Sequence, residues 1–263
     1  MFEIICFIVG ACVGSFISLS VYRLAVKEKL DSGLKCHDLR IKNKNRSYCD
    51  HCGRQLKWWE NVPIISFVLL GGRSFCCHSP IPYSYVVTEI LSGVLTVIWW
   101  QRWLAGGMNI GAGILGLTMI YLAIFLGVFD AKYKILPDRA VYLLIGLALV
   151  GVVLDEPNII PYLAAGAGGF AFLGGIYWLT KGQGIGFGDV KLAVFMGLLL
   201  GPAKLVVAMM VGFVAGAIVG LSGMIFLGWS RKKELAFGPF LLLGTVVAWE
   251  WGEKIIRIWL NGL

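Results

Sequence analysis

Eight stretches of the chain are long and apolar enough to cross a lipid bilayer, and they restrict the possible folds more than any other feature. A helix that crosses about 30 Å of hydrocarbon needs about 20 largely apolar residues. The stretches fall at residues 2–22, 83–104, 108–129, 139–155, 158–180, 190–203, 204–228 and 236–257, the sixth being short. We therefore predict an all-α polytopic membrane protein with about eight transmembrane helices.

The composition agrees with this fold class. Of the 263 residues, 58% are hydrophobic and 14% are charged, whereas a soluble domain has about 25% charged residues. No basic region precedes the first apolar stretch, and Arg23 follows it. These flanks are the reverse of a cleavable signal peptide, so residues 1–22 are expected to remain as the first span.

The basic residues are sorted by loop, which predicts the orientation. If the loop after residue 22 is cytoplasmic, 19 of the 23 Lys and Arg lie on that side, as the positive-inside rule requires. The net charge of +8 is therefore not a nucleic-acid-binding patch, and no nucleic-acid partner is expected. The same orientation places Asp130 and Asp189 on the cytoplasmic side.

Asp130 and Asp189 each stand where an apolar stretch meets water. Asp130 ends the apolar run 121–129, and Asp189 immediately precedes the stretch that begins at residue 190. A carboxylate at the edge of the hydrocarbon is costly unless it is paired or faces water. Two close carboxylates cannot both ionise, so one stays protonated while the other activates a water molecule. We predict that the two residues form the catalytic pair of an aspartyl protease.

The glycine-rich run 182–188 is predicted to be a substrate loop. Four glycines in seven residues indicate a segment that can adopt positive φ and that another backbone can approach closely. Gly186 and Gly188 would leave room for an extended substrate next to Asp189. Lys191 either tunes the local charge or anchors the chain at the lipid headgroups.

Residues 23–82 form the only segment large enough for a small soluble module, followed by the helical domain 83–263. The module contains Cys49 and Cys52 and, about 25 residues later, Cys76, Cys77 and His78. Structural zinc takes four N or S ligands, so we predict a site made by Cys49, Cys52, Cys77 and either Cys76 or His78. The alternative is a loop that folds without metal. Cys36 has no partner at ligand spacing.

Two further acids are candidates for supporting roles. Glu89 lies six residues into the second apolar stretch, as either a buried structural hydrogen-bonding group or a site residue. Asp138 follows Pro137, and it is interpreted as the cap of the next helix rather than as a third catalytic acid.

Assembled in this way, the residues resemble those of the type IV prepilin leader peptidases, which cut prepilins and N-methylate the new amino terminus. The resemblance covers nearly the whole chain, and the pairing of Asp130 with a GxGD motif is its specific part. The matching segments are Gly14-Ser15-Phe16 with Tyr22-Arg23, the Cys49/Cys52 pair, Asn61-Val62-Pro63 with Ser66, Gly72-Arg73, Tyr85 and Glu89, Asp130 with Leu136-Pro137-Asp138, Gly186-Phe187-Gly188-Asp189-Val190-Lys191, and Phe237-Gly238-Pro239.

The resemblance implies a bacterial inner-membrane enzyme with Asp130 and Asp189 as its dyad. Its substrates would be prepilins or pseudopilins, and its methyl donor would be S-adenosylmethionine. The chain departs from the family pattern at two positions. Ser74 replaces the first cysteine of the second CxxC pair, which affects the metal ligands, and Ser18 replaces an asparagine in the part associated with methyl transfer.

Two other classes of protein compete with this interpretation. An ion-coupled transporter would use the two aspartates as an ion relay, but transporter sites lie near the bilayer centre between repeated halves, and the sequence has no internal repeat. A non-enzymatic assembly scaffold for a pilus or a secretion system would need only the zinc-stabilised loop. A transporter or a scaffold would not cleave a peptide bond. Cleavage that depends on both aspartates would therefore distinguish the protease from these two classes.

Overall fold

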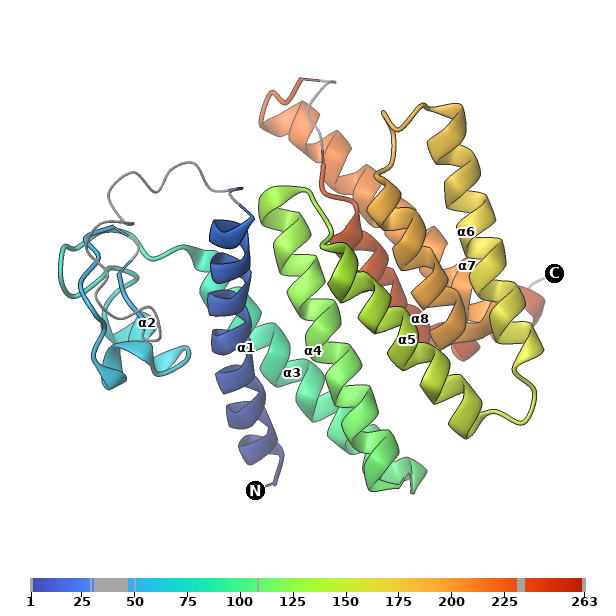
Figure 1. The fold of residues 1–263 in the computed structure, drawn as a ribbon, viewed down its shortest axis with the longest axis horizontal. Helices are drawn as coiled ribbons and strands as arrows, with labels where there is room; N and C mark the ends of the chain where they lie inside the picture. The colour runs from blue at the N-terminus through green and yellow to red at the C-terminus, as the bar shows by residue number, and fades with distance from the viewer. Residues whose placement is uncertain are drawn as a thin grey trace. The chain divides into compact units, whose positions relative to one another are not determined.

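The computed structural model describes residues 2–28, 30, 47–49, 51–107, 109–230 and 235–261 (Figure 1). Its elements in chain order are α1 (Phe2–Lys27), the 3-10 helix η1 (Trp58–Asn61), α2 (Ile65–Leu69), α3 (Tyr83–Gly106), α4 (Ile110–Tyr133), α5 (Asp138–Asp155), α6 (Ile160–Leu179), α7 (Phe187–Phe226) and α8 (Gly238–Asn261). Among the described residues the only β pairing is two isolated bridges. The all-α prediction is confirmed.

The chain divides into two compact units, residues 1–128 and 129–263. Helix α4 contributes to both, because its last five residues belong to the second unit. The predicted module 23–82 falls in the first unit. Cys36 and the basic cluster Arg231-Lys232-Lys233 lie outside the described residues.

In the first unit, α1 and α3 run antiparallel in close contact. The Gln101 side chain donates a hydrogen bond to Glu3 at one end of the pair, and Gly14 meets Glu89 farther along. A Cβ added at Gly14 would lie 2.8 Å from the Glu89 Cα, so the two backbones touch because the residue is glycine. Helix α4 packs back on α3, where the Trp99 indole donates to the Gly113 carbonyl at 3.0 Å.

In the second unit, α7 is the central helix and contacts α5, α6 and α8. Small residues again allow the close approach. A side chain at Gly197 would overlap the backbone of Gly166 in α6, and one at Gly244 in α8 would overlap the Ala208 carbonyl of α7. These contacts fix the position of α7 and therefore of Asp189, which lies in its first turn.

Helix α7 is broken at Gly201. This residue has φ 71° and ψ 179°, a conformation that is essentially restricted to glycine. Pro202 follows and has no N–H to donate to the preceding turn. The sequence therefore encodes a sharp break between a 14-residue half before Gly201 and a 25-residue half after it, as the bounds of α7 give.

The two halves of α7 run in opposite directions along α8. The first half begins beside the start of α8, where Asp189 interacts electrostatically with Asp130 and Asp130 is hydrogen-bonded to Gly238. The second half begins near the other end of α8, where Lys204 pairs with Glu253 at 2.8 Å. The break at Gly201 is therefore a reversal of the chain, at the boundary that the sequence predicts between stretches 190–203 and 204–228.

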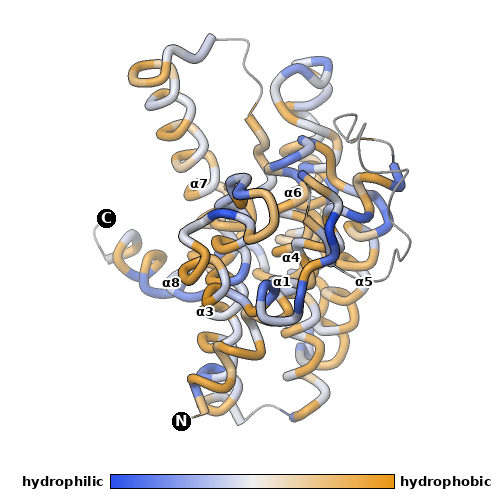
Figure 2. The backbone as a smooth tube through the Cα atoms, turned by 90° about the vertical axis from the view of Figure 1, so that its left-hand side faces the viewer, coloured by the Kyte–Doolittle hydropathy of each residue, from blue (hydrophilic) through white to orange (hydrophobic). Residues whose placement is uncertain are grey.

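Five of the helices in the described part of the chain, α1, α3, α4, α6 and α7, are long and apolar enough to cross a membrane. Figure 2 shows hydrophobic residues over much of the helical backbone. Large apolar side chains also point outward, such as Phe172 with 53% and Ile225 with 72% of its surface exposed, which suits contact with lipid. The protein is a helical membrane protein, and the count of about eight spans stays a prediction.

Candidate active site and metal site

Asp130 lies near the end of α4, and a backbone amide at the start of α8 holds its carboxylate. The Gly238 N–H donates to Asp130 Oδ2 at 3.0 Å. A Cβ added at Gly238 would lie 2.8 Å from the same oxygen, so only glycine lets the amide approach. Only 5% of the Asp130 surface is exposed. The sequence places Gly238 in a matching motif, but it gives no signal that this residue contacts Asp130.

Asp189 lies in the first turn of α7, and 6% of its surface is exposed. Its Oδ2 accepts a hydrogen bond from the Gly186 N–H at 3.1 Å, which satisfies one of the free donors at the start of the helix. Its Oδ1 is buried and has no hydrogen-bond partner among the described residues. A buried carboxylate oxygen without a partner is unusual, because such groups are nearly always hydrogen-bonded.

Asp130 and Asp189 are brought together in the second unit, where their carboxylates interact electrostatically. One oxygen of each accepts a backbone N–H, from Gly238 and from Gly186. Two carboxylates that interact in this way cannot both ionise readily. This arrangement provides one carboxylate that can remove a proton from water and one carboxyl group that can donate a hydrogen bond.

The glycine-rich run has a more specific structure than the sequence indicates. Positive φ occurs at Lys181 (52°) and Gly182 (76°), before the GxGD motif, while Gly186 has φ −75° and precedes the first residue of α7. Gly188 is needed for packing, because a Cβ there would lie 2.9 Å from the Leu136 Cβ. The motif therefore lets the start of α7 lie against the segment that follows α4.

Lys191 and Asp138 join the starts of α7 and α5. Lys191 Nζ lies 2.6 Å from Asp138 Oδ1, and the Tyr142 and Phe187 rings lie 4.9 and 5.0 Å from the same nitrogen. Lys191 is buried, whereas the Asp138 side chain is 63% exposed. Pro137 is the N-cap residue of α5 and Asp138 is the first residue of the helix, so the expected capping role is wrong. Asp138 is an ion-pair partner instead.

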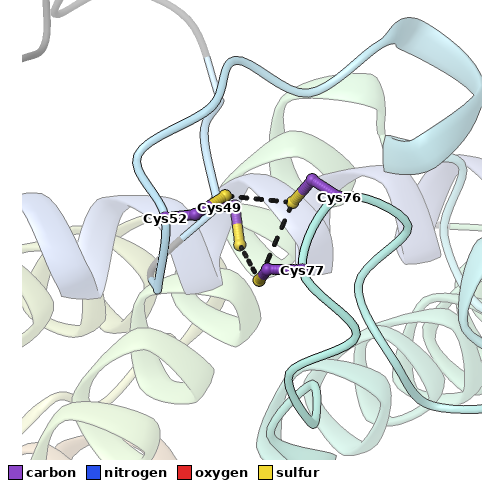
Figure 3. A group of neighbouring side chains, drawn as sticks. All are labelled: Cys49, Cys52, Cys76 and Cys77. Atoms are coloured by element: carbon purple, nitrogen blue, oxygen red, sulfur yellow. Dashed lines mark hydrogen bonds between the residues drawn. The ribbon is translucent and has the colours of Figure 1, made fainter.

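The four cysteines of the first unit form a compact cluster, drawn in Figure 3. The ligand atoms of Cys49, Cys52, Cys76 and Cys77 all lie within 4.8 Å of one another. The Sγ–Sγ distances are 3.7 Å for Cys49–Cys77, 3.2 Å for Cys52–Cys76 and 3.9 Å for Cys76–Cys77. Of the two candidates for the fourth ligand, Cys76 is the one in the cluster. His78 is exposed and lies outside it.

This donor set fits zinc. Four sulfurs at about 2.3 Å from a tetrahedral ion are about 3.8 Å from one another, close to the spacing observed here. The adjacent residues Cys76 and Cys77 both turn toward the centre of the cluster (Figure 3). Two short loops hold the pairs, since the Cys49 N–H donates to the Arg54 carbonyl and the Ser74 N–H to the Ser79 carbonyl.

Two hydroxyl groups complete the surroundings of Cys77. Ser74 Oγ lies 3.1 Å and Ser79 Oγ 3.2 Å from the Cys77 sulfur. Hydrogen bonds from these hydroxyls lower the pKa of the Cys77 thiol to about 5, whereas burial and the contact with Cys52 raise the pKa of Cys76 to about 12. Ser74, which stands where the family pattern has a cysteine, thus lies beside the cluster and hydrogen-bonds to the Cys77 sulfur. No sequence pattern marks Ser79 as a neighbour of Cys77.

Glu89 belongs to the first unit, far along the chain from the two aspartates. Its Oε2 accepts the Ile64 N–H at 2.8 Å, and it also interacts with the Ser15 hydroxyl. Ile64 has φ 60° and ψ −50°, a strained turn for a β-branched residue, closed by a hydrogen bond from the Ile65 N–H to the Pro63 carbonyl. Glu89 therefore holds a strained turn of the soluble loop onto α3.

The chain matches two protein-family descriptions. Residues 8–103 match the Bacterial Peptidase A24 N-terminal domain, and residues 117–221 match the Type IV leader peptidase family. The boundary between the two compact units, after residue 128, falls within the second match. No solved structure matches the chain significantly.

Similar proteins from three bacteria carry the name prepilin leader peptidase/N-methyltransferase. The relative from Legionella pneumophila is 30% identical, covering 93% of this chain and 90% of its own length. One from Burkholderia pseudomallei is 32% identical over 90% of this chain and 81% of its own, and one from Pseudomonas aeruginosa is 27% identical over 97% and 92%. At this identity and coverage, the chain belongs to the type IV leader peptidase family.

Proposed function

We propose that this protein is a membrane aspartyl endopeptidase that removes the basic leader from type IV prepilins or pseudopilins and then N-methylates the new amino terminus. The observation that carries the peptidase half is the interacting pair of buried carboxylates, Asp130 and Asp189. The names of the bacterial relatives support both halves. The protein would act in the bacterial inner membrane, with the dyad on the cytoplasmic side.

The dyad can hydrolyse a peptide bond without any further group. The ionised carboxylate takes a proton from a water molecule, which attacks the scissile carbonyl carbon. The protonated carboxyl group donates a hydrogen bond to the carbonyl oxygen, and the leaving amine then receives a proton from the pair. Asp189 Oδ1, which is buried and has no partner among the described residues, would be the atom that holds the water or the shared proton.

The methyltransferase half would use S-adenosylmethionine, which supplies an electrophilic methyl group to an amine. A single zinc ion bound by Cys49, Cys52, Cys76 and Cys77 would hold the loop of the first unit together. Structural zinc sites are closed by four protein ligands, as this sulfur set would be, so the ion has no catalytic part in the proposal.

The test measures leader release and methyl transfer separately, with purified protein in detergent. Asp130→Asn and Asp189→Asn keep the size of the side chain but cannot ionise, so each should abolish leader release from a membrane-embedded prepilin. The double variant should be no worse than either single one, because the two residues act as one unit. Both variants should still methylate a pilin that is supplied already cleaved.

Unchanged leader release by both asparagine variants would overturn the aspartyl mechanism. In that case the transporter and the assembly scaffold become the leading alternatives. Asp138→Asn is the matched control, because it removes a nearby carboxylate that pairs with Lys191 and is not part of the dyad. Its leader release should remain measurable.

A further inference from the structure

The first unit contains a cavity of about 790 Å³ between α1, α3 and the cysteine-containing loop. This volume falls in the range of about 300–1,000 Å³ that is typical of small-molecule sites. One face of α1 lines it, through Cys12, Ser15, Leu19, Tyr22 and Arg23, which recur at helical spacing. The cavity and the aspartate dyad belong to different compact units, so the cavity has no assigned role in leader cleavage.

Arg23 lines this cavity, and two of its donors lie unsatisfied behind the cavity wall. Its Nε and Nη2 atoms are both buried and have no hydrogen-bond partner among the described residues. These two nitrogens form one edge of the guanidinium group, and this edge binds a carboxylate through two parallel hydrogen bonds. An arginine that only anchored the end of a span would turn them toward water or lipid headgroups.

The two acidic side chains that line the cavity are already engaged. Glu60 accepts hydrogen bonds from Arg54 and from the Lys57 N–H, and Glu89 accepts the Ile64 N–H. Within the described part of the chain, neither of them pairs with Arg23. A buried guanidinium edge without a counter-ion is unfavourable, so the missing carboxylate is expected to come from a ligand.

The remaining walls suit an aromatic, positively charged ligand. Phe16, Tyr22 and Tyr48 line the cavity, and the Tyr22 and Tyr48 rings meet edge to face with centroids 6.0 Å apart. Aromatic faces attract cations and stack on planar heterocycles. A carboxylate anchor beside aromatic rings matches the methyl donor of the proposed function, which carries a carboxylate, a sulfonium and an adenine.

We propose that this cavity binds S-adenosylmethionine and that the Arg23 guanidinium turns its Nε and Nη2 edge toward the bound carboxylate. The proposal rests on the methyltransferase half of the proposed function. Arg23 is a binding residue in this assignment, and the Glu89–Ile64 contact shapes the wall opposite α1. No reaction step is assigned to either side chain.

The experiment compares two ligands on the full chain in detergent, by isothermal titration calorimetry without pilin. S-adenosylmethionine is one, and its decarboxylated form, which lacks only the carboxylate, is the other. The wild-type protein should prefer the intact donor by roughly 10- to 100-fold, because hydrogen bonds to a charged group contribute about that much. Arg23→Gln should lose most of this preference and still bind the decarboxylated form.

Lys27→Gln is the matched control, since it removes the same charge from the same helix at an exposed position outside the cavity. It should keep the wild-type preference. If Arg23→Gln also keeps the preference, or loses both ligands equally, the Arg23 assignment is wrong while the methyltransferase proposal stands.

Absence of binding of either ligand to the wild-type protein would overturn the methyltransferase half together with this site. The peptidase half would be unaffected by that result, because it is measured by leader release in the second unit. The outcomes therefore separate a failure of the binding residue from a failure of the function.

Discussion

The position of the Asp130 carboxylate depends on a backbone amide rather than on another side chain. Gly238 donates to Asp130 Oδ2 at 3.0 Å, from a place where any side chain would meet that oxygen. The addition of one methyl group at Gly238 should therefore move a proposed catalytic group without altering its chemistry. This provides a test of geometry that is separate from the removal of the carboxylates.

Gly238→Ala should lower leader release by about 10- to 100-fold, because displacement of a catalytic group by about 1 Å can reduce the rate to that extent. The Cβ would lie 2.8 Å from Asp130 Oδ2, so the carboxylate must shift. The measurement is the initial rate of prepilin cleavage. Gly168→Ala in α6 is the control, because nothing lies within 4 Å of its Cβ position, and it should be neutral or slightly stabilising.

Cys76 is expected to supply the sulfur that Ser74 lacks. Cys76→Ser should lower the zinc content of the purified protein well below one ion per chain. A second change, Ser74→Cys, should restore it, because Ser74 Oγ already lies 3.1 Å from the Cys77 sulfur. Elemental analysis by mass spectrometry measures the ratio. A full zinc ion in Cys76→Ser would show that Cys76 is not a ligand.

The ion pair between Lys191 and Asp138 ties the start of α7 to the start of α5. Asp138→Asn leaves the buried ammonium group without its partner. Because Asp138 is mostly exposed, the expected loss of stability is only about 1 kcal/mol, in the range of surface ion pairs. Unfolding in increasing SDS would measure it. Lys204→Gln breaks the exposed pair with Glu253 and serves as the comparison. An equal loss of stability in that variant would show that the Lys191–Asp138 pair stabilises the protein no more than an ordinary surface pair.

The reversal of α7 depends on one glycine. Gly201→Ala must adopt φ 71° and ψ 179°, which should destabilise the protein by about 1–3 kcal/mol. The Cβ would also lie 3.2 Å from the Tyr162 ring. The same SDS titration measures the loss, and Gly146→Ala in α5, where nothing lies within 4 Å, is the comparison that should show none.

Most of the helices could be predicted from the sequence, because long apolar stretches have few alternatives in a membrane. The segment near residue 201 was predicted as a boundary between two stretches, and the structure adds that the break is a reversal within one continuous element. The ion pair of Lys191 with Asp138 could not be predicted, because 53 residues separate the two. They lie on different helices, so no spacing along one helix links them. The cap expected at Asp138 was wrong because the helix begins one residue earlier than that role requires, with Pro137 as its N-cap residue.

At the scale of the whole molecule, the two proposed activities fall in different compact units. Cys49 belongs to the sulfur cluster and also lines the cavity of the first unit. Cys49→Ser should therefore reduce zinc content and binding of S-adenosylmethionine together, while leader release changes little. Elemental analysis, calorimetry and prepilin cleavage on the same preparation check the three results. A parallel loss of cleavage would show that the units depend on each other.

The composition of the candidate sites was predictable to different degrees. Asp130 and Asp189 stand out in the sequence because carboxylates are rare at the edges of apolar stretches. Cys76 was one of two open choices, since spacing alone does not say whether adjacent cysteines can face one centre. Arg23 and Gly238 gave no separate signal, because a free guanidinium edge and a donor amide are visible only once the surrounding chain is placed.

The reversal at Gly201 also restricts how the chain can enter the membrane. The first half of α7 has 14 residues, and at 1.5 Å per residue it is about 21 Å long, shorter than the hydrocarbon layer. Released alone from the insertion machinery, this segment would make a poor span. We expect the first half to insert into the membrane together with the second half, as a helical hairpin. Asp189 would then be positioned only after residues 202–226 have been synthesised.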